Sequence, residues 1–464
     1  MPAAQRYDDL VIGAGQAGVP LSRALAEAGR RTALVESTHV GGTCINEGCT
    51  PTKTMAASAR VAYLAQRAGD YGVDTGPVTV DLARVRQRKR DIVESWRRSS
   101  EQRLLATDGL DLLMGEARFA GPHTVQVRLR SGEERLLEAE RIVIDVGTRP
   151  AIPALPGLNE VPFRDSTTIM ELEEVPEHLL ILGGGYVAVE FGQMFRRFGS
   201  AVTIVQRAAQ LLPREDADVA AEVTSILRED GLEIVLEGHG RRVAATGDDG
   251  ICLTVATPDG ERTLTGSHLL VAVGRAPNSD RLDPDAAGLK LDERGFLVVN
   301  ERLETNVPGI WAAGDVKGGP AFTHVAYDDF RILRTNLLEG GAASTNGRLV
   351  PYTVFMDPQL GRVGLTEKEA RKAGYPIAVA SLPMSWVARA LETGEPRGLL
   401  KAVVHAETDR ILGAAVLGSE GGEIMAVLQA AMLGGVTAAT LRETVFAHPT
   451  LAEALNNLFG TLVG

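Results

Sequence analysis

The sequence lacks a surplus of positive charge. Its 464 residues hold 48 Lys and Arg against 60 Asp and Glu, which gives a formal net charge of -12. A phosphate-binding surface needs a clustered basic excess, so this balance argues against a nucleic-acid partner. The most basic stretch, residues 84–98, is interleaved with Asp91 and Glu94 and is typical of a solvated helix face.

Long hydrophobic runs are also missing. No segment reaches the roughly 18 uninterrupted apolar residues of a membrane span. The first ten residues lead into a strand-like run without a basic-then-apolar signal, so we expect a cytoplasmic protein with no membrane partner. Apolar residues still make up 44% of the chain, enough for a large core, and the length predicts about three domains.

Cysteine is the third scarce feature, with only Cys44, Cys49 and Cys252 in the chain. In a reducing compartment, two cysteines as close as the first two indicate catalysis or metal binding rather than a structural disulfide. The sequence assigns no role to Cys252, which lies in a strand-like run.

Two glycine-rich segments stand far apart and share the same surroundings. Residues 13–18 (Gly-Ala-Gly-Gln-Ala-Gly) follow the strand-like run 7–12, and residues 183–188 (Gly-Gly-Gly-Tyr-Val-Ala) follow the run 179–182. A helical pattern and a second strand-like run come after each of them. This order predicts an internal duplication of a nucleotide-binding unit.

The glycines of the first segment have separate physical tasks. Gly13 permits the tight turn, Gly15 lets the backbone approach a pyrophosphate, and Gly18 lets helix and strand pack closely. The helix N-terminus then presents unpaired amides to the phosphates. Glu36, 18 residues beyond Gly18, is placed to accept hydrogen bonds from the adenosine ribose.

The remaining pattern predicts an α/β fold with two Rossmann-like dinucleotide-binding domains and a separate C-terminal α+β domain. Strand-like runs at 141–146 and 268–273 close the two units and lead to Gly147 and Gly274. Pro150, Pro153 and Pro156 indicate a linker between the units. After about residue 345 the pattern changes to strands, among them 352–355 and 411–416, and a helix at 423–432.

Cys44 and Cys49 lie in the run 41–53, directly after the first unit. In a regular helix, positions i and i+5 lie about 8–9 Å apart, beyond the reach of a disulfide. A bridge therefore needs an irregular turn, for which Gly48 is suited, and it would be labile because its loop is short. A structural disulfide, half of a zinc site and two unrelated thiols are the alternatives; zinc would need two further Cys or His ligands.

These motifs, in this order, resemble the class I pyridine nucleotide–disulfide oxidoreductases, the family of dihydrolipoamide dehydrogenase, glutathione reductase and mercuric reductase. The resemblance implies bound FAD, with Cys44 as the interchange thiol that faces the substrate and Cys49 as the charge-transfer thiol that faces the flavin. It also implies that Lys53 lies near the flavin N5 and pairs with Glu190.

The resemblance extends to the other motifs. The run 305–315, which ends in Gly314-Asp315, matches the family's second FAD motif, in which Asp315 binds the ribityl chain. The implied domains are FAD-binding at 1–150 and 276–345, NAD(P)-binding at 151–275 and dimerisation at 346–464. Further residues expected at the two cofactor sites are Gly42, Thr43, Gly147, Gly274 and Arg275.

In the second nucleotide unit, Gly183, Gly185 and Ala188 occupy the fingerprint positions. An NAD site favours an acid at the end of the next strand, but this chain has Gln206 followed by Arg207, with Arg214 nearby. An arginine can pair with a 2′-phosphate, so we expect NADPH rather than NADH. Tyr186 matches the family's gate over the nicotinamide pocket.

A C-terminal run, 446–453, supplies the acid–base group. His448 can take and return the proton that disulfide opening requires, with Glu453 to fix its tautomer. In the family this histidine reaches the cysteines of the partner subunit, which implies an obligate homodimer. The sequence indicates no resident metal site.

The segments 322–331 and 351–356 are similar to the mercuric-reductase-like group that includes the bacterial reactive-chlorine-resistance flavoproteins. This similarity implies stress-linked reduction of a disulfide, an oxidant or a metal ion. The last ten residues hold no cysteine, so the usual mercury route is not expected. Alternatives are a dihydrolipoamide dehydrogenase, a flavin-only diaphorase or NADPH oxidase, and a non-catalytic flavin-binding module.

Overall fold

The computed structural model describes residues 4–247 and 250–462. Its contacts divide the chain into two compact units, each built from three segments. Unit 1 consists of Met1–Thr54, Arg86–Ala151 and Arg275–Arg348. Unit 2 consists of Met55–Val85, Ile152–Gly274 and Leu349–Gly464. Within the described residues, no helix is long and apolar enough to cross a membrane.

Unit 1 is built on a six-stranded sheet. Its strands are β1 (Gln5–Ile12), β2 (Thr32–Glu36), β3 (Leu110–Gly121), β4 (Thr124–Leu129), β5 (Glu134–Ile144) and β15 (Ile310–Ala312). β1 pairs in parallel with both β2 and β5, β3 continues the parallel sheet beside β2, and β15 does so beside β5. β4 is antiparallel to β3 and β5. The sheet of the first predicted nucleotide unit is therefore parallel apart from β4, and its parallel part agrees with the strand–glycine–helix order.

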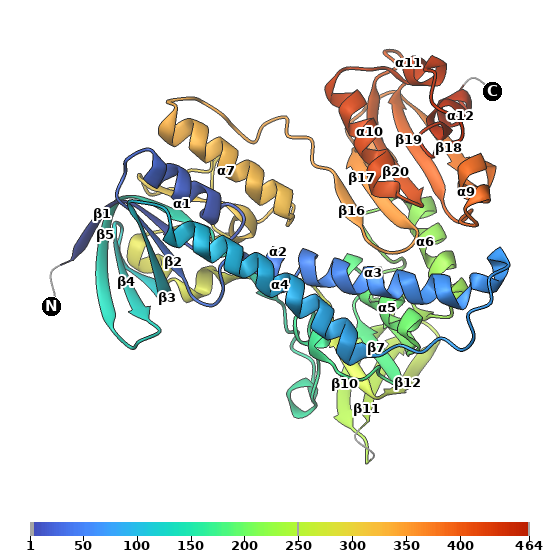
Figure 1. Ribbon diagram of the computed structural model, residues 1–464, viewed down its shortest axis with the longest axis horizontal. Helices are drawn as coiled ribbons and strands as arrows, with labels where there is room; N and C mark the ends of the chain where they lie inside the picture. Colours follow the sequence, from blue (N-terminus) through green and yellow to red (C-terminus); the bar gives the residue numbers. More distant parts are fainter. Residues whose placement is uncertain (1–3, 248–249, 463–464) are drawn as a thin grey trace. The chain divides into compact units, whose positions relative to one another are not determined.

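The helices of unit 1 cover this sheet because its central strands are apolar on both faces. All five residues of β2 are buried. Helix α1 (Gly18–Glu27) lies beside helix α7 (Thr323–Leu338), and the two share a core with Leu34 and Val143 (Figure 1). The smaller elements are α2 (Gly42–Asn46), β6 (Thr148–Pro150), β14 (Arg275–Pro277), η4 (Asn278–Arg281), η5 (Pro284–Ala287) and η6 (Gly314–Lys317).

Two long helices belong partly to each unit. Helix α3 (Cys49–Gln66) passes from unit 1 to unit 2 after Thr54, and helix α4 (Leu82–Leu105) enters unit 1 at Arg86. Four of the eight basic residues of α4 are exposed, three are half-buried and Lys89 is buried, so the helix face is less solvated than the charge pattern predicts.

The first part of unit 2 is the second nucleotide-binding fold. Its four-stranded parallel sheet has the order β13-β7-β8-β9, and an antiparallel sheet has the order β10-β11-β12. The elements are β7 (His178–Leu182), α5 (Tyr186–Phe198), β8 (Ala201–Val205), α6 (Ala217–Glu229), β9 (Glu233–Val235), β10 (His239–Ala245), β11 (Ile251–Thr257), β12 (Gly260–Gly266) and β13 (His268–Val271). Short 3₁₀ turns are η1 (Ala68–Tyr71), η2 (Leu158–Glu160) and η3 (Thr168–Glu171). Cys252 lies in β11, as the sequence predicts.

The second part of unit 2 is a five-stranded antiparallel sheet with the order β16-β17-β20-β19-β18 (Figure 1). Its elements are β16 (Tyr352–Val354), β17 (Gln359–Gly364), α8 (Glu367–Lys372), β18 (Ile377–Pro383), η7 (Met384–Trp386), α9 (Ala388–Glu392), β19 (Leu399–His405), β20 (Ile411–Gly418), α10 (Gly421–Leu433), α11 (Ala438–Glu443) and α12 (Ala454–Gly460). The predicted change to an α+β pattern after residue 345 is thus confirmed.

One hydrophobic core joins the two parts of unit 2. Phe191 and Phe195 of α5 are almost fully buried in it, together with Leu360 and Leu417 from the C-terminal sheet. Helix α3 contributes Met55 to the same core, from the part of the helix that follows Thr54.

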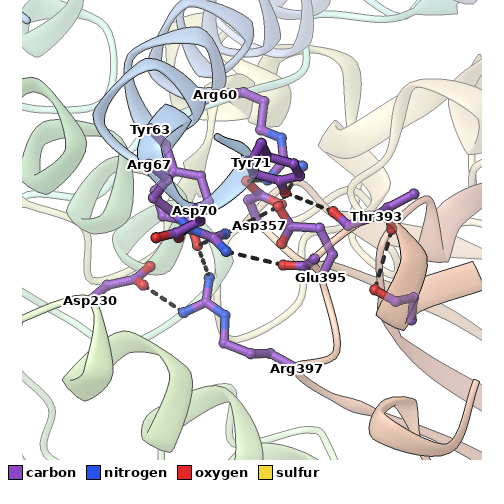
Figure 2. A network of polar contacts seen from close by, with 12 residues as sticks. Arg60, Tyr63, Arg67, Asp70, Tyr71, Asp230, Asp357, Thr393, Glu395 and Arg397 are labelled. Atoms are coloured by element: carbon purple, nitrogen blue, oxygen red, sulfur yellow. Dashed lines mark hydrogen bonds and ion pairs between the residues drawn. The ribbon is translucent and has the colours of Figure 1, made fainter. Parts of the chain in front are cut away.

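A group of four arginines around Tyr63 adds a polar attachment to this core, and Figure 2 labels Arg60, Arg67 and Arg397 among them. Arg197 stacks closest, with its Cζ atom 3.8 Å from the ring centroid, and Arg67 lies at 4.9 Å. The Tyr63 hydroxyl accepts hydrogen bonds from Arg67 at 2.7 Å and Arg397 at 3.1 Å. Arg60 completes this set, which we call the Tyr63 cluster.

Buried and half-buried carboxylates balance the charge of the Tyr63 cluster (Figure 2). Asp357 binds Arg60 at 2.5 Å and also binds Arg197. Glu395 binds Arg60 at 2.9 Å, and Asp230 binds Arg397 at 2.6 Å. Burial alone would raise the pKa of Asp357, but the two arginines outweigh it and hold this pKa below its usual value.

We predict that Asp357→Asn destabilises the protein by about 2–3 kcal/mol at pH 7, because it leaves buried arginine charge without its partner. The lowered pKa of Asp357 means that its contribution is present above the pKa of the unfolded chain and is lost as the pH falls through the folded value. The difference in free energy of unfolding between wild type and variant should therefore shrink below about pH 4.

The matched control is Asp70→Asn, which removes the exposed partner of Arg67, a side chain with 64% of its surface accessible. Urea unfolding should show a change below about 0.5 kcal/mol for this variant. Equal effects of the two substitutions would contradict the importance of the buried pairs.

Candidate redox and nucleotide sites

The cysteine pair lies at a break between two helices. Helix α2 ends at Asn46, its C-cap residue Glu47 leaves the helical conformation with φ -140°, and α3 begins at Cys49. A Cβ atom on Gly48 would lie only 3.0 Å from the Thr43 carbonyl oxygen, so glycine suits this turn. The break brings the thiols of Cys44 and Cys49 within hydrogen-bonding distance, and no disulfide joins them in the structure. The irregular turn expected from the sequence is present.

The environment of the two thiols differs. The hydrogen bond to Cys49 and burial raise the pKa of the Cys44 thiol, while Thr323 and Lys53 act in the opposite direction. Cys44 is half-buried and Cys49 is exposed. With a raised pKa, Cys44 is protonated at neutral pH and needs a base before it can act as a nucleophile.

Thr323 is a neighbour of the pair that the sequence reasoning missed. Its Oγ1 lies 3.3 Å from the Cys49 sulfur, at the first residue of α7. The sequence placed it in the segment 322–331, which carries the family resemblance, but did not indicate its contact with the cysteines. The next residue, His324, stacks on Phe322 with ring centroids 5.4 Å apart.

The first glycine segment forms the tight turn between β1 and α1 that its spacing predicts. Gly13 has φ +103°, and a Cβ atom there would lie 2.3 Å from the Asp145 carbonyl oxygen. A Cβ atom on Gly18 would lie 2.1 Å from the Gly13 carbonyl oxygen. Gly13 and Gly18 contribute no side chains of their own where the loop enters a ten-residue helix, and a helix start of this kind fits a pyrophosphate.

Glu36 lies at the end of β2, beside this loop. Its carboxylate accepts hydrogen bonds from the main-chain amides of Ala14 at 2.9 Å and Thr38 at 2.7 Å. It therefore fixes the glycine loop to the next turn. Its predicted hydrogen bonds to a ribose remain a prediction.

The second FAD motif lies at η6. Gly314 has φ +67°, and the Asp315 carboxylate accepts a hydrogen bond from the Thr148 hydroxyl at 3.3 Å. Arg275 donates to the same hydroxyl at 2.6 Å, one residue after Gly274. Burial raises the pKa of Asp315, and Arg275 opposes this rise. The structure thus brings Asp315 and Arg275 together and places Gly147, which has φ +61°, directly before Thr148.

Gly41, Gly42 and Thr43 lie at the start of α2. Gly41 and Gly42 both have positive φ, and a Cβ atom on Gly42 would lie 2.8 Å from the Gly15 Cα atom. The chain that carries Cys44 therefore packs directly against the first glycine loop.

The second glycine segment has the same turn with one difference. A Cβ atom on Gly183 would lie 2.3 Å from the Ala272 carbonyl oxygen, whereas one on Gly185 would meet no atom within 4 Å. Gly183 is therefore required by the fold, and the room at Gly185 fits the approach of a pyrophosphate. Tyr186, the first residue of α5, is 39% exposed.

The end of β8 carries the residues expected to select the nicotinamide nucleotide. Gln206 is buried and donates to the Gln210 carbonyl oxygen at 3.1 Å. Arg207 and Arg214 are exposed, and in the described part of the chain no ion pair holds either guanidinium. Both can therefore move to meet an anionic ligand.

His448 and Glu453 form a hydrogen-bonded pair in the turn before α12. The His448 Nδ1 atom lies 2.9 Å from Glu453 Oε2 and 3.1 Å from Oε1. This contact assigns the proton of neutral His448 to Nδ1 and leaves Nε2 as the acceptor. The imidazole is 67% exposed.

The two residues of the predicted Lys53–Glu190 pair belong to different units. Lys53 lies in unit 1, and Glu190 lies in unit 2, where its carboxylate accepts a hydrogen bond from the Phe355 amide at 2.8 Å. Their pairing remains a prediction. Among the described residues, no group of three or more His, Cys, Asp or Glu side chains is arranged to hold a metal ion.

Two nucleotide-binding folds, a thiol pair beside one glycine loop and a His–Glu pair define a pyridine-nucleotide-dependent flavin oxidoreductase. The family model of pyridine nucleotide-disulphide oxidoreductases matches residues 7–329, and the model of their dimerisation domain matches residues 350–459. The chain belongs to this family, in its class I, and the match implies FAD, a pyridine nucleotide and a homodimer.

Individual relatives agree with this assignment. The probable pyridine nucleotide-disulfide oxidoreductase RclA of Escherichia coli is 39% identical over 98% of this chain and 99% of its own. A mercuric reductase of Staphylococcus aureus is 34% identical over 97% of this chain and 81% of its own. A dihydrolipoyl dehydrogenase of Haloferax volcanii is 36% identical over 96% of this chain and 94% of its own.

A solved structure is similar throughout. It is the Cu(II) complex of the HOCl-induced flavoprotein disulfide reductase RclA from Escherichia coli, with a TM-score of 0.89 and 39% identity. The match covers 98% of this chain and 99% of that one.

We predict that Gly185→Ala leaves the fold and the bound flavin intact but raises the KM for the nicotinamide nucleotide about tenfold or more. The added methyl group meets no protein atom, so it competes only with the ligand. The matched control is Gly183→Ala, whose Cβ atom meets the Ala272 carbonyl oxygen at 2.3 Å and should lower the melting temperature. An unchanged KM in Gly185→Ala would contradict the proposed path of the pyrophosphate.

Proposed function

We propose that this protein is an NADPH-dependent flavoprotein reductase that passes electrons through Cys44 and Cys49 to a disulfide, an oxidant or a metal ion. FAD, when bound, supplies the two-electron step between the nicotinamide and the thiol pair. The observation that carries the proposal is the hydrogen bond between two thiols at a helix break beside the first glycine loop. A module that only bound flavin would have no use for this arrangement.

The proposed domains follow the family pattern. Residues 1–150 and 276–345 bind FAD, residues 151–275 bind the nicotinamide nucleotide, and residues 346–464 form the dimer. Gly13, Gly15, Gly18, Glu36 and the residues around Asp315 support the first assignment through the geometry described above. The same glycine turn at Gly183 supports the second.

The thiol chemistry follows from the different environments of the two sulfurs. Two electrons and two protons open the Cys44–Cys49 disulfide to a pair of thiols. With a disulfide acceptor, deprotonated Cys44 attacks one acceptor sulfur and releases one thiol. Cys49 then attacks the mixed disulfide, re-forms the bond to Cys44 and releases the second thiol. With Cu(II), two metal ions each accept one electron, and the same protein disulfide forms with release of two protons.

His448 is the proposed base for the first step. The raised pKa of Cys44 creates the need for a base, and Glu453 orients the imidazole so that Nε2 can take the proton. We propose, from the family pattern, that His448 acts on the cysteines of the partner subunit and that the dimer is obligate. The exposed imidazole is consistent with this use.

Stress-linked reduction is the proposed setting. RclA, which is similar over nearly the whole chain, is described as HOCl-induced and was solved with Cu(II), and mercuric reductases are also similar. A dihydrolipoamide dehydrogenase is the alternative raised by the third relative. Gln206 in place of an acid at the end of β8 favours the NADPH-linked reductase.

We predict that anaerobic NADPH reduces the wild-type protein with a long-wavelength charge-transfer absorbance that Cys49→Ser lacks. Cys44→Ser should keep its flavin and that absorbance but lose more than about 99% of turnover, since it lacks the attacking thiol. Turnover is measured with lipoamide, glutathione disulfide, Hg(II), Cu(II) and hypochlorite-oxidised thiols. Full activity of Cys44→Ser would identify a flavin-only diaphorase or oxidase instead.

We predict that Arg207→Ala raises the KM for NADPH about tenfold and leaves the KM for NADH within about twofold, because only NADPH carries the 2′-phosphate. The control is Arg241→Ala, an exposed arginine on β10 that should change neither KM. Steady-state kinetics with both nucleotides decide the question. A wild-type preference for NADH, or equal effects on both nucleotides, would overturn the assignment.

A further inference from the structure

Asp145 is a buried acid of unit 1, in the segment Arg86–Ala151, and its sequence pattern did not indicate a functional role. Only 6% of its surface is exposed. Its Oδ2 atom accepts hydrogen bonds from the main-chain amides of Gly18 at 2.7 Å and Ala17 at 3.2 Å. These amides belong to the start of α1, the helix end at which the glycine spacing predicts a pyrophosphate.

The same residue also contacts the rest of the FAD site. Its main-chain amide donates to the Ile12 carbonyl oxygen at 2.7 Å, and its carbonyl oxygen lies against Gly13. A Cβ atom on Gly15 would lie 2.6 Å from its Oδ2, and one on Gly314 would lie 2.6 Å from its Oδ1. One carboxyl group therefore lies between the first glycine loop and the second FAD motif.

Negative charges around Asp145 destabilise its ionised form. Asp315 and Asp329 are close enough to affect it, and they lie on η6 and α7. Asp329 is paired with Lys317 at 3.2 Å and Arg348 at 2.8 Å.

Two further charged groups complete these surroundings. Arg275 faces Asp315, and the Glu36 carboxylate is held by loop amides on the β2 side. Asp145 itself is held by two neutral amides. A pyrophosphate at this helix end would add further negative charge.

We propose that Asp145 is a positioning residue of the FAD site and that its carboxyl group holds α1 and the Gly314 turn in its neutral form when FAD is bound. One oxygen of a neutral carboxyl group still accepts from both amides, and no charge faces the pyrophosphate. Burial, with Asp315 and Asp329, raises the pKa of Asp145, although the Gly18 and Ala17 amides oppose this.

The proposal fixes the sign of a pH dependence. If the FAD-bound state requires the proton on Asp145, the affinity for FAD falls as the pH rises through the pKa of this group in the flavin-free protein. Asn is an uncharged equivalent of the protonated acid: its Oδ1 can accept from the two amides at any pH. Asp145→Asn should therefore bind FAD without this decrease.

The test is the dissociation of FAD from the purified holoprotein, followed by the fluorescence of released flavin between about pH 6 and pH 9. Wild type should lose affinity up to about tenfold per pH unit above the relevant pKa, and Asp145→Asn should stay within about threefold across the range. Asp145→Ala should bind about tenfold more weakly at pH 6, because it leaves two buried amides without an acceptor. Asp280→Asn, at an exposed ion pair with Arg149, is the control that should match wild type.

Two results would overturn the proposal. One is a parallel pH dependence in wild type and Asp145→Asn; the other is an Asp145→Asn protein that loses FAD as readily as Asp145→Ala. Thermal unfolding of the flavin-free proteins shows whether Asp145→Ala is folded. If it is not, the comparison of wild type with Asp145→Asn still decides the outcome.

Discussion

The contact between the Cys44 and Cys49 thiols is the interaction on which the proposed function of this protein depends. Five positions along a regular helix would keep the two sulfurs apart, and the break between α2 and α3 removes that constraint. Gly41 and Gly42 then allow the start of α2 to pack closely against the first glycine loop. The cysteine pair and the first glycine loop are thus two parts of one local structure.

The two nucleotide folds use the same turn with different neighbours. In the first, the side chains of Asp145 and Glu36 occupy main-chain amides of the loop and bind it to neighbouring strands and turns. In the second, the space at Gly185 is open and the arginines that follow β8 are exposed. This difference agrees with a cofactor that stays bound in the first fold and a substrate nucleotide that enters and leaves the second.

The sequence predicted the elements that depend on local patterns. The strands before each glycine segment, the turns at Gly13 and Gly183, and the change of fold class after residue 345 all follow from spacing and hydrophobicity. Thr323, Asp145 and the Tyr63 cluster escaped prediction because their contacts join residues far apart in the chain. Asp145 is 127 positions from Gly18 and Thr323 is 274 from Cys49, and no local pattern indicates either contact.

The roles assigned to His448, Lys53 and Glu190 depend on the family pattern, whereas the partnership of the two cysteines can be tested without it. The most direct measurement is mass spectrometry of the air-oxidised protein after alkylation, with and without prior anaerobic NADPH. We predict that Cys44 and Cys49 become alkylated only after NADPH is added, whereas the alkylation of Cys252 does not change with the nucleotide. Equal labelling of both thiols in the untreated protein, or none after reduction, would contradict a redox pair at this helix break.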